Sequence, residues 1–337
     1  LYPYIKLRAT ISDDSNFTPT PVQLADWYVL YDEIPEAALN SSRAYSFHAP
    51  ALQQGDNLKF NIAIENVSSA GMDSLRIKYW IVNSQQNMDS LLYKKNRPLP
   101  AGNVMFDTVS FPTKNLSGNC RFWIEVNPMD TLWQLEQYHF NNIASIGFTS
   151  EKDNMNPLLD VTFDGIRILN GDIVSPKPEI VIQLKDENKY LALDDTAEFK
   201  IFITDPDKKS ERIYFVQSGK EQMRFNKAVL PDNKCKIEYR PVFLRDGIYE
   251  LRVQGSDASG NNAGDLDYSI TFEVINKSTI TEILNYPNPF STSTRFVFTL
   301  TGSEIPDYFK IQILTVSGKV IREITRNELG NIHIGRN

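Results

Sequence analysis

Hydrophobic and polar residues alternate in short runs along most of the chain. In the first half these runs lie at residues 57–65, 74–82, 107–111, 121–126 and 144–148. A period of two places the apolar side chains of a run on one face of a β-strand, and turn residues separate the runs. We therefore expect residues 35–152 to form an antiparallel β-sandwich, with short helical turns only at 35–40 and 133–138.

The same pattern continues after a polar linker at residues 153–157. Alternating runs lie at 159–163, 166–169, 180–184, 197–203, 211–215, 236–240, 244–253 and 268–274. Residues 246–253 (DGIYELRV) and 257–261 (DASGN) resemble the late hairpin of bacterial immunoglobulin and fibronectin type III modules. We expect residues 158–277 to form a second sandwich, in which Tyr249 caps the backbone at a corner.

A proline-containing stretch marks a boundary near the C-terminal end. It consists of Asn285, Tyr286, Pro287, Asn288, Pro289 and Phe290. Both prolines fix φ and lack an N–H donor, so the stretch cannot be a helix or a central strand. We expect a stiff extended connector that opens a third β module at 283–337. Its strands are predicted at 295–300, 309–316 and 319–324, followed by an irregular tail at 331–337.

Residues 1–34 hold two further alternating runs, at 4–11 and 24–31, with a polar loop at 12–21 between them. Two strands cannot form an independent domain. They are expected to be either an accessory hairpin or the last strands of a domain that precedes them. Because the chain opens at Leu1 with neither Met nor a signal peptide, we expect it to be a piece of a longer protein.

Composition narrows the class of protein. The chain has 337 residues, of which 41% are hydrophobic and 11% aromatic, enough for packed cores in roughly two to four domains. A net charge of −7 and a pI near 5.2 argue against nucleic-acid binding, which requires a basic face. No apolar run is long enough for a transmembrane segment. The expected fold class is all-β, with tandem antiparallel sandwiches and a partial C-terminal β module.

Residues for catalysis are scarce. The chain has two cysteines, Cys120 and Cys235, and no Cys-x-x-Cys or His-x-x-x-His spacing that would indicate zinc. A Cys/His pair would need His48 or His139 beside Cys120, which begins a strand that looks structural. We expect two buried thiols in different domains, which leaves a disulfide between them as the alternative. No catalytic residue and no organic cofactor are predicted.

Calcium is the one metal that the sequence suggests. Asp257, Asp265 and Asp267 flank the loop 260–264, and calcium prefers hard oxygen ligands. No EF-hand spacing is present, and turn-forming aspartates are the alternative. Further carboxylate pairs lie at 186–187, 194–195 and 205–207.

Exposed aromatic residues could form a sugar-binding surface. Trp133 lies in a polar stretch and Trp27 in the N-terminal segment, so both are candidate ligand residues. Trp80 and Trp123 lie inside predicted strands, where we expect them to be core residues.

Two regions of the first sandwich resemble bacterial extracellular adhesion modules of the CARDB type. They are residues 57–71, a strand that ends in an Asn-containing turn, and residues 136–142 (EQYHFNN) before the final strand. Paired asparagines suit a turn, because their side chains bond to nearby backbone. A binding role for Asn141 and Asn142 is the alternative.

A wider resemblance covers nearly the whole chain. Four motifs keep their order: LLDVTFDGIRILNGDIVSPKPEI at 158–180, KDEN at 185–188, LNYPNPFSTSTRFVFTL at 284–300 and KIQILTVSGKVIREI at 310–324. Together they resemble the region after the peptidase domain in gingipain-type cysteine peptidases of Bacteroidetes, most closely the sortase-like members of type IX secretion. The third module is similar to the type IX C-terminal sorting domain, whose start would be the Asn285–Phe290 stretch.

The resemblance implies a setting and a role. It implies secretion to, or attachment at, the outer-membrane surface of a Gram-negative bacterium. The implied partners are the type IX machinery and an upstream peptidase domain of the same chain, which would carry the catalytic residues. The chain would then be a spacer, docking surface and sorting region. A carbohydrate-binding or adhesin array is the alternative. The sorting-type module ends after GRN, before its usual last strands, so we expect it to be frayed or paired with a partner.

Overall fold

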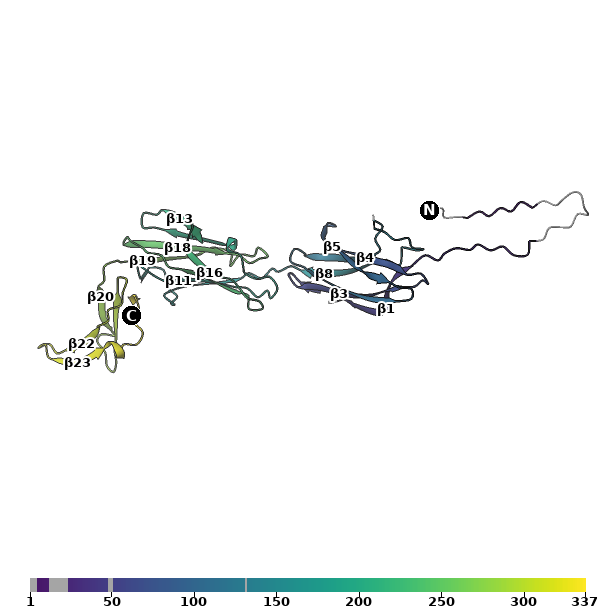
Figure 1. The fold of residues 1–337 in the computed structure, drawn as a ribbon. Coiled ribbons are helices and arrows are strands. Elements are labelled where there is room, and N and C mark those ends of the chain that lie inside the picture. Colours follow the sequence, from purple (N-terminus) through teal and green to yellow (C-terminus); the bar gives the residue numbers. More distant parts are fainter. Residues whose placement is uncertain (1–4, 12–23, 48–50, 131) are drawn as a thin grey trace, which may run out of the picture.

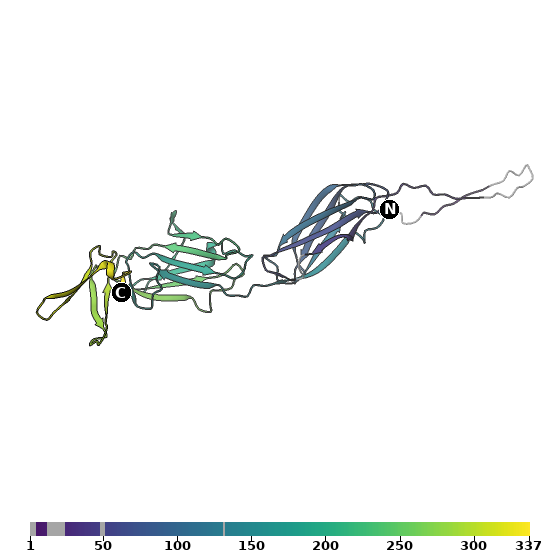
Figure 2. The ribbon, with the colours of Figure 1, turned by 90° about the horizontal axis from the view of Figure 1, so that it is seen from below.

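The chain folds into successive β modules. The computed structural model describes residues 5–11, 24–47, 51–130 and 132–337. Figures 1 and 2 show two sandwiches one after the other, with a smaller module at the C-terminal end. Within these described ranges, regular structure consists of strands and two short 3-10 helices, Thr196–Glu198 and Arg326–Glu328. The all-β prediction is confirmed.

The first sandwich packs a three-stranded sheet, in the order β1-β3-β6, against a five-stranded sheet, β2-β8-β7-β4-β5. Its strands are β1 (Ala37–Phe47), β2 (Ala51–Gln53), β3 (Asn57–Asn66), β4 (Met72–Val82), β5 (Met88–Leu99), β6 (Val104–Pro112), β7 (Gly118–Val126) and β8 (Ile143–Glu151). Alternation decides which side chains enter the core: on β4, Ile77, Tyr79 and Ile81 are completely buried, whereas the residues between them face outward.

Local signals mislead at three places in this sandwich. The helical turn expected at 35–40 is instead the start of β1, because Ala37 to Asn40 pair with β3. The helical turn expected at 133–138 is irregular backbone. The edge strand β5 has no counterpart among the predicted runs, because most of its residues are exposed and its sequence does not alternate.

The second sandwich packs a four-stranded sheet, β16-β17-β11-β9, against a five-stranded sheet, β10-β19-β18-β12-β13. Its strands are β9 (Leu158–Phe163), β10 (Asp172–Val174), β11 (Ile180–Lys185), β12 (Phe199–Thr204), β13 (Ser210–Ile213), β14 (Val216–Gln217), β15 (Lys220–Glu221), β16 (Met223–Asn226), β17 (Lys234–Tyr239), β18 (Gly247–Gly255) and β19 (Tyr268–Val274). Its core is separate from that of the first sandwich. Each module therefore has its own hydrophobic centre.

Tyr249 occupies the corner position expected from the sequence. Its ring is 5% exposed and stacks on Phe272, and its hydroxyl donates to the Arg245 carbonyl oxygen at 3.0 Å. The hydrogen bond ties the residues that precede β18 to the strand itself.

The variant Tyr249→Phe is expected to lower the free energy of unfolding of the second sandwich by about 1–2 kcal/mol. The reason is that the Arg245 carbonyl loses its donor while the ring packing is kept. Urea denaturation measures the loss. The matched control is Tyr214→Phe, since Tyr214 is 51% exposed. Equal effects of the two substitutions would contradict a role for the corner hydrogen bond.

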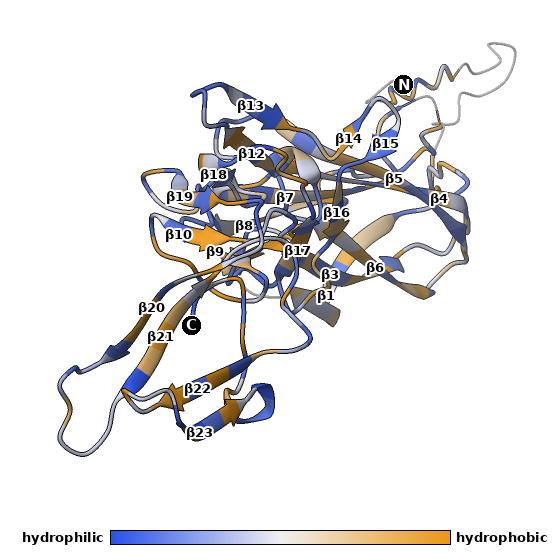
Figure 3. Ribbon diagram, turned by 90° about the vertical axis from the view of Figure 1, so that its left-hand side faces the viewer, coloured by the Kyte–Doolittle hydropathy of each residue, from blue (hydrophilic) through white to orange (hydrophobic). Residues whose placement is uncertain are grey.

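The third module consists of the sheet β20-β21-β24 and the hairpin β22-β23. Its strands are β20 (Ile280–Tyr286), β21 (Arg295–Leu300), β22 (Lys310–Leu314), β23 (Val320–Thr325) and β24 (Gly335–Arg336). Figure 3 shows hydrophobic segments on β21, β22 and β23. The fully formed core is small and consists of Phe298, Leu300 and Phe309. The strands are hydrogen-bonded rather than frayed; pairing with a partner stays a prediction.

Two expectations for this module are corrected. Asn285 and Tyr286 end β20, which pairs with β21, so the two prolines lie in a hairpin loop and not in a connector between domains. The hydroxyl of Thr294 donates to the Pro287 carbonyl across this loop at 2.9 Å. The tail at 331–337 is not irregular throughout, because β24 pairs with β21. Tyr286 and Phe290 are exposed.

The N-terminal segment forms no accessory hairpin within its described residues; that it supplies the last strands of a preceding domain stays a prediction. Residues 5–11 and 24–34 are extended and carry no strand pairing. Their apolar side chains have no sheet to cover them, which removes the reason for a stable hairpin. Tyr4, the loop at 12–21 and His48 lie outside the described residues. In the described part of the chain, no helix has the length and apolar character needed to cross a membrane.

Candidate functional site

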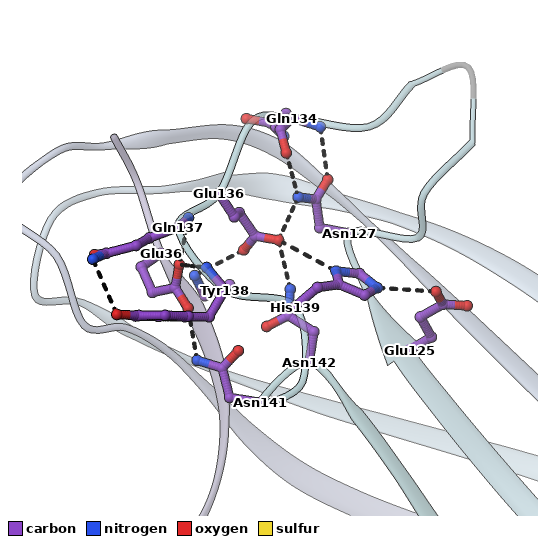
Figure 4. A network of polar contacts seen from close by, with 11 residues as sticks. Glu36, Glu125, Asn127, Gln134, Glu136, Gln137, Tyr138, His139, Asn141 and Asn142 are labelled. Atoms are coloured by element: carbon purple, nitrogen blue, oxygen red, sulfur yellow. Dashed lines mark hydrogen bonds and ion pairs between the residues drawn. The ribbon is translucent and has the colours of Figure 1, made fainter. Parts of the chain in front are cut away.

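A buried polar network ties the start of β1 to the loop between β7 and β8 (Figure 4). Glu136 is 8% exposed and lies at its centre. Its Oε1 accepts from the Ala37 backbone N–H at 2.9 Å, and its Oε2 accepts from the side-chain amides of Asn127 and Asn142 at 2.6 Å each. Burial raises the pKa of Glu136, and these donors oppose that shift.

Glu36 completes the network from the other side. Its Oε2 accepts from the backbone N–H groups of Gln137 and Tyr138 at 2.9 and 3.0 Å, and its Oε1 accepts from the Asn141 amide at 2.7 Å. Asn141 and Asn142 therefore each donate to a carboxylate that fixes the loop. This favours the structural interpretation of the paired asparagines over a binding role.

The contacts of His139 and Cys120 place the two side chains on opposite faces of β7. His139 Nε2 lies 3.1 Å from Glu125 Oε1, while Cys120 packs into the core from the same strand, β7. Residues 120 and 125 have opposite parity in a strand, so their side chains leave on opposite faces. Cys120 and Cys235 are both buried free thiols in separate sandwiches, as expected.

A second polar centre lies where the two sandwiches meet. Asp153 belongs to the linker after β8, Asp186 follows β11 and Asp257 follows β18. One carboxylate oxygen from each lies within 4.8 Å of the others, and Asp186 and Asp257 are buried. We call these three residues the junction cluster.

The carboxylates of the junction cluster accept hydrogen bonds from neutral groups only. Asp257 Oδ1 accepts from the backbone N–H groups of Ser259 and Asn261, both at 2.8 Å. Asp186 accepts from the Glu187 backbone N–H and from the Asn233 amide. Among the described residues, none of the three aspartates forms an ion pair with a basic side chain.

This buried, uncompensated negative charge shifts the pKa of Asp186. Burial, and then the nearby charges of Asp153 and Asp257, raise the pKa of Asp186 to about 6. A divalent cation would neutralise this uncompensated negative charge, and carboxylate oxygens are the ligands that calcium prefers.

The linker is hydrogen-bonded to both sandwiches at this point. The Asp153 N–H donates to Gln54 Oε1 of the first sandwich at 3.2 Å. From the second sandwich, the Asn261 amide donates to the Asp153 carbonyl at 3.1 Å, and the Asn188 amide reaches Asp153 Oδ2 at 2.9 Å. An open cavity of about 360 Å³ lies alongside, lined partly by Gln54 and Asn188.

The structure changes the composition of the predicted calcium site. Asp257 lies in the junction cluster, but Asp265 and Asp267 do not. Both are exposed, and Asp267 lies 3.8 Å from Arg252 instead. The missed partner Asp186 belongs to KDEN, and Asp257 belongs to DASGN. Each of these motifs supplies one aspartate and one asparagine to the junction.

The four tryptophans differ in exposure, and two of them lie on a different face from the one expected. Trp27 is 47% exposed, but it lies on the unpaired N-terminal segment. Trp133 is half-buried, and its Nε1 is enclosed without a hydrogen-bond partner. Trp80 and Trp123, expected in the core, lie on the outer face of the five-stranded sheet. Their strand neighbours Tyr79 and Phe122 take the inward positions instead.

Comparison with known proteins finds partial similarity in structure only. No protein-family model matches the chain, and no curated protein matches it. The CARDB domain of a Pyrococcus furiosus protein, solved with two metal ions, is 15% identical at a TM-score of 0.28 and covers 37% of this chain and 99% of its own.

Two larger solved structures also match in part. Dimeric latent PorU from Porphyromonas gingivalis is 13% identical at a TM-score of 0.28, over 87% of this chain and 29% of its own. Red sea bream transglutaminase is 11% identical at a TM-score of 0.27, over 71% and 32%. The chain is thus similar to parts of several solved structures, and none of them assigns it to a family.

Proposed function

We propose that this chain is a non-catalytic array of β modules that acts as spacer and docking surface in a secreted or surface protein. The observation that supports this is the junction, where the linker is hydrogen-bonded to Gln54 on one side and to Asn188 and Asn261 on the other. A linker held from both sides keeps successive modules in line, as a spacer requires. Flexible Gly/Ser linkers behave differently, as random coils.

The proposed parent is a gingipain-type cysteine peptidase exported by type IX secretion, with its catalytic residues upstream. The support is the set of four ordered motifs at 158–180, 185–188, 284–300 and 310–324. Within it, residues 283–337 would form the first part of the sorting-type module that the export machinery reads, opening at Asn285–Phe290. The location would be the outer-membrane surface of a Gram-negative bacterium.

Peptidase assays on the parent and on residues 1–337 test the non-catalytic role. With a peptide library as substrate, we expect cleavage by the full-length parent and none by residues 1–337. Cleavage by residues 1–337 alone would overturn the proposal. Export is tested in the host strain. Deletion of residues 283–337 from the parent should leave it in the periplasm, and normal export of the deletion variant would contradict the sorting role.

A second proposal concerns the junction cluster. We also propose that Asp153, Asp186 and Asp257 bind calcium and thereby stiffen the junction. The supporting observation is the raised pKa of Asp186, which lies buried between two other carboxylates. The Ser259 hydroxyl, in the turn that Asp257 closes, is buried without a hydrogen-bond partner. The test is a calcium titration that follows stability, and its outcome is argued in the Discussion.

A further inference from the structure

Two tryptophans form a stacked pair on the outside of the first sandwich. Trp80 of β4 lies directly opposite Trp123 of β7 in the antiparallel ladder. Their ring centroids are 5.5 Å apart and their planes differ by 3°. Such a cross-strand pair stabilises the sheet by itself. The stacked rings cover one face of each other, and Lys78 Nζ lies 4.7 Å from the centroid of the Trp80 ring, so Trp123 has the less covered aromatic face.

The sheet beside this pair is left open by small residues. Ser145 of β8 lies opposite Trp123, and Gly147 lies opposite Arg121. A Cβ atom added at Gly147 would meet nothing within 4 Å. No bulky side chain of β8 therefore covers the tryptophan pair from that side.

A hollow of about 440 Å³ lies over this face, next to the β4–β5 turn. Besides both tryptophans, its lining includes Arg121 and the amide residues Asn83, Gln86 and Asn119, and no acidic residue among those that the structure describes. In a chain of net charge −7, this is a local excess of positive charge and of hydrogen-bond donors.

The donors of the hollow are only partly used within the protein. Arg121 donates through Nη1 to the Ser145 hydroxyl at 3.0 Å, and it forms no ion pair with any described carboxylate. Asn119 accepts from the Thr149 hydroxyl through its Oδ1 at 3.1 Å. The free N–H groups suit a ligand that is rich in oxygen acceptors.

The turn that borders the hollow holds Gln86 in an unusual conformation. Its φ is 65°, in the left-handed region that glycine adopts at lower cost. Asn83 Oδ1 maintains the turn by accepting from the backbone N–H groups of Gln85 and Asn87, both at 3.0 Å. The turn thus places the amide side chain of Gln86 at the rim, at a position that glycine would occupy without strain.

We propose that this hollow binds an acidic saccharide, such as the uronate units of a surface polysaccharide. The apolar C–H face of a pyranose ring packs on the indole of Trp123, on the side that Ser145 leaves open. The free N–H groups of Arg121 bind the carboxylate, a charge-assisted contact that guanidinium makes in a planar fork. Neutral amides at the rim, including Gln86, donate to ring hydroxyls. The combination of flat aromatic surface, one cation and several amides fits a sugar better than an acidic peptide.

The test titrates residues 1–337 with tri-galacturonate, with neutral galactotriose and with a Glu-rich peptide. Calorimetry and tryptophan emission follow binding. We expect tri-galacturonate to bind, and both Trp123→Ala and Arg121→Gln to weaken it by about tenfold or more. Gln86→Gly should weaken binding without lowering the melting temperature, which separates a lost contact from misfolding.

The matched control is Tyr214→Ala, which removes another exposed aromatic residue that lies beside an arginine, Arg212 at 5.1 Å. This variant should bind tri-galacturonate normally. Three results would overturn the proposal: equal binding of the neutral sugar, binding of the peptide but not of the sugar, or unchanged affinity in the Trp123, Arg121 and Gln86 variants.

Discussion

The variant Glu136→Ala is expected to lower the free energy of unfolding of the first sandwich by about 3–5 kcal/mol, which is a large part of a domain's stability. The carboxylate accepts from the Ala37 backbone and from the amides of Asn127 and Asn142. Asn127 is 1% exposed and Asn142 is completely buried, so water cannot replace the lost acceptor. Each buried donor left without a partner destabilises the fold by about 1–3 kcal/mol.

Guanidinium denaturation of residues 1–337 measures this loss as a shift of the first-sandwich transition. Glu136→Gln should be intermediate, because it keeps one acceptor oxygen and the side-chain volume but turns an N–H group toward donors. Glu151→Ala is the control, since Glu151 is exposed at the end of β8. If Glu136→Ala destabilises no more than Glu151→Ala, the network does not stabilise the sandwich.

Asp186→Asn is expected to stabilise the calcium-free protein at pH 7.5, by at most about 3 kcal/mol for a shift of roughly two pKa units. The pKa of Asp186 is raised to about 6 in the folded protein, from 3.8 for an ordinary aspartate. The folded state therefore keeps this proton more tightly than the unfolded state. Between these two values stability falls as the pH rises, and above pH 7 the whole penalty is present.

The asparagine variant escapes that penalty with little loss of hydrogen bonding. Asn233, which donates to Asp186, also donates to the backbone carbonyls of Asn188 and Leu191 at 2.8 and 2.7 Å. Its amide protons thus stay satisfied. The stability difference between Asp186→Asn and the unchanged protein should be near zero at pH 3.5 and should grow up to pH 7. A pH-independent difference would contradict the raised pKa.

Calcium should narrow the stability difference between the two proteins at pH 7.5. A cation bound by the junction cluster stabilises the folded state by mass action, and the melting temperature should rise by a few degrees. The rise should be lost in Asp186→Asn, smaller at pH 4.5, and retained in Asp265→Asn, whose site lies outside the cluster. The calcium proposal fails if millimolar calcium leaves the melting temperature of the unchanged protein where it was.

Much of the fold was readable from local patterns. The runs at 57–65, 121–126 and 180–184 coincide with β3, β7 and β11 because each has one buried face and one exposed face. The exposed edge strand β5 and the start of β1 have no such contrast between their faces. They form because a neighbouring strand offers hydrogen bonds: β3 pairs with the start of β1, and the adjacent hairpin strand β4 pairs with β5.

The candidate sites were harder to predict from the sequence, because their residues lie far apart in the chain. Loop aspartates are common, and nothing near Asp257 in the sequence indicates that Asp153 and Asp186 approach it from 104 and 71 positions away (257 − 153 and 257 − 186). Trp80 and Trp123 illustrate the second difficulty, because a tryptophan in a strand suits either face. Only the pairing of β4 with β7, and the packing of Tyr79 and Phe122 inward, places both indoles on the outside.

The sequence by itself determined the all-β class, the turns and the positions of most strands, because alternation and turn chemistry act over a few residues. It also limited the chemistry, since two cysteines and three histidines leave little material for a catalytic centre. Only the tertiary structure decided which loops meet at the junction, which carboxylates share a buried space, and which tryptophans face solvent. These properties depend on contacts between residues far apart in the chain, and no local pattern encodes such distances.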